Sequence, residues 1–216
     1  MHVVLFGAAG QVAQRIAREA LSRDHRVTAV VLDRNRFKTY DDRLTVVEGS
    51  ATDSASVARV SKGADAIVSA ISPRPHPDGR SGSSLVDAAR ALIQGAKRAG
   101  VKRLVVVGGA GSLEVAPGKQ LVDSPDFPAA YKPEALAHRD ALAVYRAEAG
   151  DLEWTNISPA ALFTPGERTG KYRAGGDQLL ADKQGKSFIS FEDYAIAVLD
   201  ELERPKHTGR RMTVAY

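Results

Sequence analysis

The chain has 216 residues, of which 44% are hydrophobic and 26% are charged; this composition is typical of a folded globular protein and excludes an intrinsically disordered one. It has no cysteine, which excludes disulfides, thiolate catalysis and cysteine-based metal sites. The formal net charge of +4 is spread along the chain, and no run of about eighteen apolar residues is present, so neither nucleic-acid binding nor a membrane span is expected.

Short apolar runs alternate with longer amphipathic segments along the chain. The apolar runs predict β-strands at residues 3–6, 27–32, 44–48, 64–71, 101–107 and 153–158. The amphipathic segments, with apolar residues three or four apart, predict helices at residues 11–22, 53–60, 83–99 and 133–148. Beyond residue 158 the pattern is weaker and predicts a strand at 188–190, a helix at 191–203 and a last strand at 212–215.

The predicted strands are almost continuously apolar, which indicates a sheet that is buried on both faces. Their alternation with helices indicates a parallel sheet, and therefore an α/β protein with a Rossmann-type doubly wound fold. We expect a single domain over residues 1–216, with a small C-terminal extension on the substrate side. The first residues, MHVVLF, run directly into a glycine turn and predict a strand rather than a signal peptide, so a cytoplasmic location is expected.

Two long connections follow predicted strands at the carboxyl edge of the sheet, where ligands of such folds bind. One covers residues 72–84 and is rich in proline, glycine and serine; the other covers residues 108–130. Such loops are often lids or binding loops, and ordinary surface loops are the alternative. His76, in the first loop, has no partners at metal-ligand spacing, and no metal site is predicted.

The strongest local pattern is the turn GAAGQVA at residues 7–13, between the first strand and the first helix. Gly7 permits a tight turn, and Gly10 lets the backbone approach a diphosphate at the positive end of the helix. The pattern predicts that NAD or NADP binds here, with a plain glycine turn as the alternative. The predicted cofactor contacts are Gly7, Ala9, Gly10, Gln11 and Val12 in this turn, and Ala70, Ile71, Ser72, Gly108 and Gly109 where the fourth and fifth strands end.

The end of the second strand is expected to meet the adenosine ribose. Asp33 is placed to accept a hydrogen bond from a ribose 2′-hydroxyl, which favours NAD. Arg34 and Arg36 are placed to clamp a 2′-phosphate, which favours NADP. Because Lys38 adds a third positive charge, NADPH is the expected cofactor and NADH the alternative. Asp53, after the third strand, is expected either to cap a helix or to touch adenine.

Several segments together resemble the atypical short-chain dehydrogenase/reductase superfamily, in particular the NADH–flavin reductases that are related to flavin/biliverdin reductases and NmrA-like proteins. They are VLFGAAG at 4–10, GSATD at 49–53, GVKRLVVVGGAGS at 100–112 and WTNISPAALFTPGERTGKYR at 154–173, followed by residues 175–180 and 189–195. The resemblance covers almost the whole chain, and its late segment is the most specific part. It implies a Rossmann fold, an NAD(P) cofactor and reduction of a flavin or a similar planar acceptor, with Ser158 and Pro159 facing the nicotinamide.

The chain departs from this superfamily at its acid–base group. Many members use a Tyr-x-x-x-Lys motif, but Tyr131 is followed four residues later by Ala135, and glycines 108 and 109 stand where a serine is expected. If the protein uses an acid, the candidates are His138, Tyr131 and Ser112; for His138 the alternative is a packed or exposed helical histidine.

A flavin can accept a hydride and take its proton from water, so catalysis without a dedicated acid is also expected to be feasible. Arg168 and Lys171 are candidates for holding an anionic substrate, or else belong to a surface turn. The favoured function is NAD(P)H-dependent reduction of a flavin, a quinone or a similar planar acceptor. The alternative is a non-catalytic NAD(P) sensor, and an epimerase is less favoured because that chemistry usually needs the tyrosine–lysine pair. A monomer and a homodimer both remain open.

Overall fold

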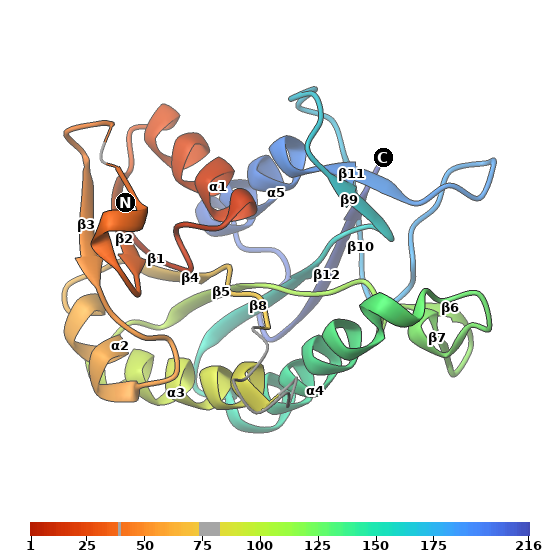
Figure 1. Ribbon diagram of the computed structural model, residues 1–216, viewed down its shortest axis with the longest axis horizontal. Helices are drawn as coiled ribbons and strands as arrows, with labels where there is room; N and C mark the ends of the chain where they lie inside the picture. The colour runs from red at the N-terminus through yellow and green to blue at the C-terminus, as the bar shows by residue number, and fades with distance from the viewer. Residues whose placement is uncertain (39, 74–82) are drawn as a thin grey trace.

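The protein is built around one eight-stranded sheet (Figure 1). The computed structural model describes residues 1–38, 40–73 and 83–216. The strand order is β10-β12-β8-β5-β4-β1-β2-β3, and all neighbours are parallel except β10 and β12. In sequence order these strands are β1 (His2–Phe6), β2 (Arg26–Val31), β3 (Leu44–Glu48), β4 (Ala66–Ser69), β5 (Arg103–Val107), β8 (Glu153–Ser158), β10 (Arg173–Gly175) and β12 (Arg210–Ala215).

Helices cover both faces of the sheet (Figure 1). One face carries α1 (Gln11–Ser22) and α5 (Phe191–Glu203), and the other carries α2 (Ser54–Ser61), α3 (Ser83–Ala99) and α4 (Lys132–Glu148). Each helix buries an apolar stripe against the sheet, as its periodicity predicts. The expected Rossmann-type fold is therefore confirmed, with element boundaries that differ from the predicted ones by at most two residues.

The topology places a crevice at one point of the carboxyl edge. The chain runs from β1 outward through β2 and β3, and then returns to β4 on the other side of β1. The loops after β1 and β4 therefore leave the sheet in opposite directions. Ligands of open α/β sheets bind in the crevice that such a reversal creates.

The remaining elements are short and were not predicted, except for the strand at 188–190. The connection after β5 contains a hairpin of β6 (Glu114–Ala116) and β7 (Lys119–Gln120) rather than an irregular loop. The C-terminal part contains β9 (Leu162–Thr164), which pairs in parallel with β11 (Phe188–Ser190). Three 3₁₀ turns complete the fold: η1 (Arg34–Arg36), η2 (Leu121–Asp123) and η3 (Ala129–Tyr131).

Candidate functional site

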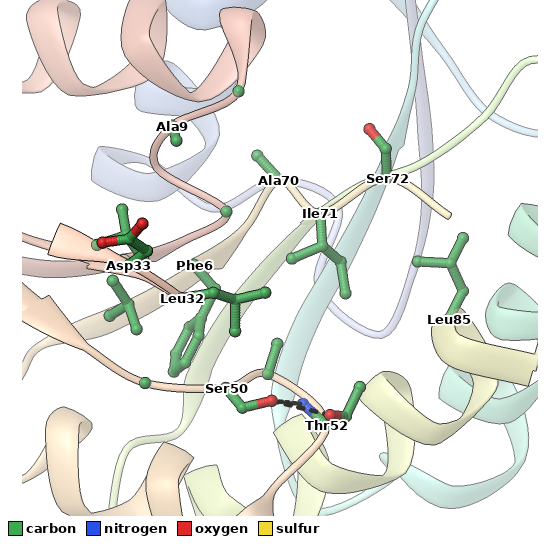
Figure 2. Close-up of a pocket in the computed structure, with 16 residues that line it drawn as sticks. Phe6, Ala9, Leu32, Asp33, Ser50, Thr52, Ala70, Ile71, Ser72 and Leu85 are labelled. Carbon is green, nitrogen blue, oxygen red and sulfur yellow. Dashed lines mark hydrogen bonds between the residues drawn. The ribbon is translucent and has the colours of Figure 1, made fainter. Parts of the chain in front are cut away.

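A cavity of about 420 Å³ opens at the carboxyl ends of β1, β2, β3 and β4, at the point where the strand order reverses (Figure 2). Figure 2 shows Asp33 on the β2 side of this cavity, and Ser72 and Leu85 on the opposite side. We call it the switch-point cavity. Its lining residues are Phe6, Gly7, Ala9, Gly10, Val30, Val31, Leu32, Asp33, Gly49, Ser50, Ala51, Thr52, Ala70, Ile71, Ser72 and Leu85.

The turn after β1 has glycine at both of its ends, and its conformation requires glycine at Gly7. Gly7 has a φ of +75°, and a Cβ there would lie 2.7 Å from the carbonyl oxygen of Ala70, so any side chain would strain the backbone and collide with the end of β4. Gly10 has an extended backbone, with φ −72° and ψ 153°. A Cβ on Gly10 would lie 3.2 Å from the carbonyl oxygen of Gly7, on the side of the turn that lines the cavity. The backbone is therefore open to a ligand at this point.

The first turn of α1 presents free donors beside the cavity. Gly10 is the N-cap residue and has no side chain to cap the helix, and the first turn carries no acidic residue. Gln14 N donates to the carbonyl of Gly10, whereas the amides of Gln11, Val12 and Ala13 donate to no described residue. Unsatisfied amides at the positive end of a helix favour an anion, most often a phosphate.

The loop after β2 forms the side of the cavity where the ribose was predicted to bind. Asp33 lines it, and its Oδ1 accepts a hydrogen bond from Asn35 N at 2.9 Å. Arg34 is exposed and does not line the cavity; its backbone N donates to Oε1 of Glu48 at 3.3 Å. Arg36 is the last residue of η1. Asp33 therefore lines the cavity, whereas Arg34 does not.

Comparison with known proteins agrees with this geometry. Residues 7–205 match a protein family described as NAD(P)H-binding. The matched region covers most of the chain and begins at Gly7. The chain belongs to this NAD(P)H-binding family. The resemblance to atypical short-chain dehydrogenase/reductases is thereby confirmed.

Solved structures of similar proteins share the fold over the full chain. A protein from Burkholderia pseudomallei described as a candidate exported protein is 47% identical over the whole of both chains, with a TM-score of 0.88. A candidate epimerase from Bacteroides thetaiotaomicron is 40% identical over the whole of this chain and 96% of that one, with a TM-score of 0.90. A candidate NADH–flavin reductase from Streptococcus pneumoniae is 32% identical over the whole of this chain and 99% of that one, with a TM-score of 0.85.

In this NAD(P)H-binding chain, the part of the cavity formed by the ends of β2 and β3 includes residues that sequence reasoning did not assign. Leu32 is 62% exposed and offers an apolar surface at the rim. Ser50 and Thr52, whose hydroxyls hydrogen-bond at 2.8 Å, line the wall below it. The signal was present, since GSATD directly follows β3. Asp53 does not line the cavity; its Oδ1 accepts from Ala55 N at 2.9 Å and caps α2, so its expected capping role is confirmed.

The predicted nicotinamide side lies outside the switch-point cavity. Gly108, Gly109, Ser158 and Pro159 are not among its lining residues. Ser158 is 1% exposed, and its hydroxyl, although buried, has no hydrogen-bond partner among the described residues. Gln11 and Val12 also do not line the cavity, although their amides open beside it. The lining of the cavity thus includes seven of the predicted contacts: Gly7, Ala9, Gly10, Asp33, Ala70, Ile71 and Ser72.

The three candidate acids lie in different surroundings. Tyr131 is 64% exposed at the N-terminal end of α4. Ser112 is buried, and its hydroxyl accepts from Arg211 at 2.8 Å in a second cavity of about 510 Å³ between α4 and the β6–β7 hairpin. His138 packs on Gly109: a Cβ added to Gly109 would lie 2.9 Å from the Cβ of His138. The structure does not bring these three residues together at the switch-point cavity, and none of them lines it.

Burial lowers the pKa of His138 from 6.5 to about 4, so the imidazole is neutral at pH 7. The unfolded chain takes up the proton near pH 6.5 and the folded protein only near pH 4. Stability is therefore complete above pH 6.5 and falls as the pH drops towards 4, by about 3 kcal/mol for this shift. We expect urea unfolding at pH 7 and pH 4 to show that the parent loses this much more stability than a His138→Gln variant. Equal losses in both proteins would contradict the burial of a neutral histidine.

The turn that contains Arg168 and Lys171 is bound to helices α1 and α5. Arg168 donates to both carboxylate oxygens of Glu19 on α1, each at 3.0 Å. The next residues are fastened to α5, because Asp193 accepts from the Thr169 hydroxyl and from Gly170 N at 2.8 Å. Arg168 thus forms an ion pair with Glu19, which agrees with the surface-turn alternative, and binding of a substrate by Arg168 stays a prediction.

Two features are absent from the part of the chain that the structure describes. No helix in that part is both long and apolar enough to span a membrane. The described residues contain no group of three or more histidine, aspartate or glutamate side chains arranged to hold a metal ion. His76 lies outside the described residues.

Proposed function

We propose that the protein is an NAD(P)H-dependent reductase that passes a hydride to a flavin, a quinone or a similar planar acceptor. The observation that carries this proposal is the switch-point cavity, which combines a glycine turn, uncapped helix amides and a carboxylate on one rim. This combination suits the diphosphate and the ribose of a dinucleotide. A similar protein of known structure is described as a candidate NADH–flavin reductase, which supports the reductase proposal.

We expect different residues to bind different parts of the cofactor. The open backbone at Gly7 and Gly10 admits the diphosphate, and the amides of Gln11–Ala13 face its negative charge. Asp33 is placed to bind the ribose, and Leu32 covers the adenine with apolar surface. A bound nicotinamide supplies a hydride, and a flavin acceptor takes its proton from water. This chemistry suits a chain in which His138 is neutral and Tyr131 has no lysine four residues later.

A non-catalytic NAD(P) sensor is the second candidate. The specific observation in its favour is that none of His138, Tyr131 and Ser112 lines the switch-point cavity. An epimerase finds less support, although one similar protein is described as a candidate epimerase, because the tyrosine–lysine pair that such chemistry usually needs is missing.

Steady-state oxidation of NADH and NADPH, followed at 340 nm with FMN, FAD and small quinones, separates these candidates. We expect turnover with at least one planar acceptor, at a rate that grows with protein concentration. A Gly10→Val variant, which fills the backbone opening, is the matched control and should be inactive. Binding of either nucleotide with no turnover on any acceptor would favour the sensor and contradict the reductase.

A further inference from the structure

The loop that follows β2 has two consecutive backbone amides directly after Asp33, those of Arg34 and Asn35. Successive amides in a turn form a concavity that binds anions such as phosphate. NADPH differs from NADH only by a 2′-phosphate on this ribose, so these amides are natural ligands for that group. Whether they are free decides how well the loop can accept it.

Both amides are already bound by carboxylates of the protein. Asn35 N donates to Asp33 Oδ1 at 2.9 Å, and Arg34 N donates to Glu48 Oε1 at 3.3 Å. A 2′-phosphate would have to displace two hydrogen bonds and lie beside two negative charges. NADH makes no such demand, because the Asp33 carboxylate can also accept a bond from a free 2′-hydroxyl.

The position of Glu48 follows from the sheet. Glu48 is the last residue of β3 and pairs in register with Val31, the last residue of β2. Gly49 N donates to the carbonyl of Val31 at 3.0 Å, which holds the two strand ends together. The backbone carbonyl of Glu48 accepts from Arg59 at 3.2 Å, and its carboxylate accepts from Arg34 N at 3.3 Å. The sheet register therefore delivers a second acidic group to the ribose loop from a different strand.

We propose that Glu48 is a specificity-determining residue which, with Asp33, makes the protein prefer NADH to NADPH by occupying the amides of the ribose loop. This inference rests on the proposed function. It reverses the order of preference expected from Arg34, Arg36 and Lys38, because the side chain of Arg34 is exposed and lies outside the lining of the cavity. Discrimination of this kind works by repelling the wrong ligand rather than by binding the right one more tightly.

The test compares the dissociation constants of NADH and NADPH, measured by calorimetry or by the fluorescence of the bound nicotinamide. We expect the parent to bind NADH at least tenfold more tightly. Glu48→Gln keeps an oxygen acceptor for Arg34 N and removes the charge. It should strengthen NADPH binding about fivefold, the upper range for one exposed charge, and leave NADH binding unchanged. This gain in NADPH affinity should be smaller at high salt, because the Glu48 carboxylate and the 2′-phosphate are both accessible to solvent.

Two further variants sharpen the result. The double variant Asp33→Asn with Glu48→Gln should bring the dissociation constants of NADH and NADPH closer together than Glu48→Gln does alone. Glu148→Gln makes the same chemical change at a residue that pairs with Arg90 on α3 and does not line the cavity, and it should alter neither constant. Thermal unfolding of each variant shows that it remains folded.

Each outcome has a distinct meaning. Tighter binding of NADH by the parent, with a gain for NADPH alone in Glu48→Gln, supports the inference. Equal or tighter binding of NADPH by the parent, or an equal change for both nucleotides in Glu48→Gln, overturns the inference and leaves the proposed function intact. Binding of neither nucleotide by the folded parent overturns the proposed function itself.

Discussion

Replacing Gly10 with valine should weaken NADH binding about 100-fold while the protein stays folded. The extended backbone of Gly10 is allowed for any residue, and the nearest atom to an added Cβ is the carbonyl oxygen of Gly7 at 3.2 Å. The side chain would instead fill the space beside the first amides of α1. A loss of this size corresponds to about 2.7 kcal/mol, typical of forcing extra atoms into a fitted contact. Calorimetric titration of both proteins with NADH measures it.

Gly150→Val is the matched control for this change. Gly150 follows α4, and a Cβ there would meet nothing within 4 Å, so the same substitution adds the same atoms to open space. We expect this control to bind NADH as the parent does. If Gly10→Val also bound NADH like the parent, the turn after β1 would not be the diphosphate site.

Replacing Glu201 with alanine should lower the free energy of unfolding by about 3–5 kcal/mol, the range for breaking a buried ion pair. The side chain of Glu201 is 2% exposed and accepts hydrogen bonds from the Arg103 guanidinium and the Thr155 hydroxyl, each at 3.2 Å. It also bonds to the backbone N and the ring Nδ1 of His207, each at 2.9 Å. Burial alone would raise the pKa of Glu201, but the hydrogen bonds from His207 and Lys206 lower it overall, so the carboxylate stays charged. Urea unfolding at pH 7 measures the loss.

Glu203→Ala provides the comparison on the same helix. Glu203 pairs with Arg23 and His25 at the partly exposed edge of α5, where ion pairs contribute about 1 kcal/mol or less. A similar loss of stability in both variants would contradict the central place given to Glu201. Arg103 begins β5, at the opposite edge of the sheet from the switch-point cavity, so folded Glu201→Ala should bind NADH normally.

The fold was predictable because its long elements carry strong periodic signals. The helices at 11–22, 83–99 and 191–203 were predicted with their observed bounds, since each has an amphipathic stripe. The strands β9 and β10 were missed because three residues show little period, although β11, which is equally short, was predicted. The β6–β7 hairpin was missed for the same reason, because its strands have only three and two residues.

The candidate site was predictable only where local chemistry fixes it. Gly7 was identified because a tight turn needs it, Gly10 because it lets the backbone approach a diphosphate, and Asp53 because it precedes a helix. The partners of Arg34 and Arg168 lie elsewhere in the sequence: Glu48 reaches Arg34 through strand register, and Glu19 reaches Arg168 across 149 residues. Partners so far apart in the sequence could not be predicted from the residues around Arg34 and Arg168.

Titration of the ¹⁵N-labelled protein with NADH, followed by ¹H–¹⁵N NMR, tests most directly whether the uncapped start of α1 binds the cofactor. The account predicts that the largest shifts fall on the amides of residues 10–13, with smaller ones at Ser50, Thr52 and Ser72 around the same cavity. The contradicting result would be unchanged amides at residues 10–13 with the shifts gathered instead around Ser112 and Arg211 in the second cavity.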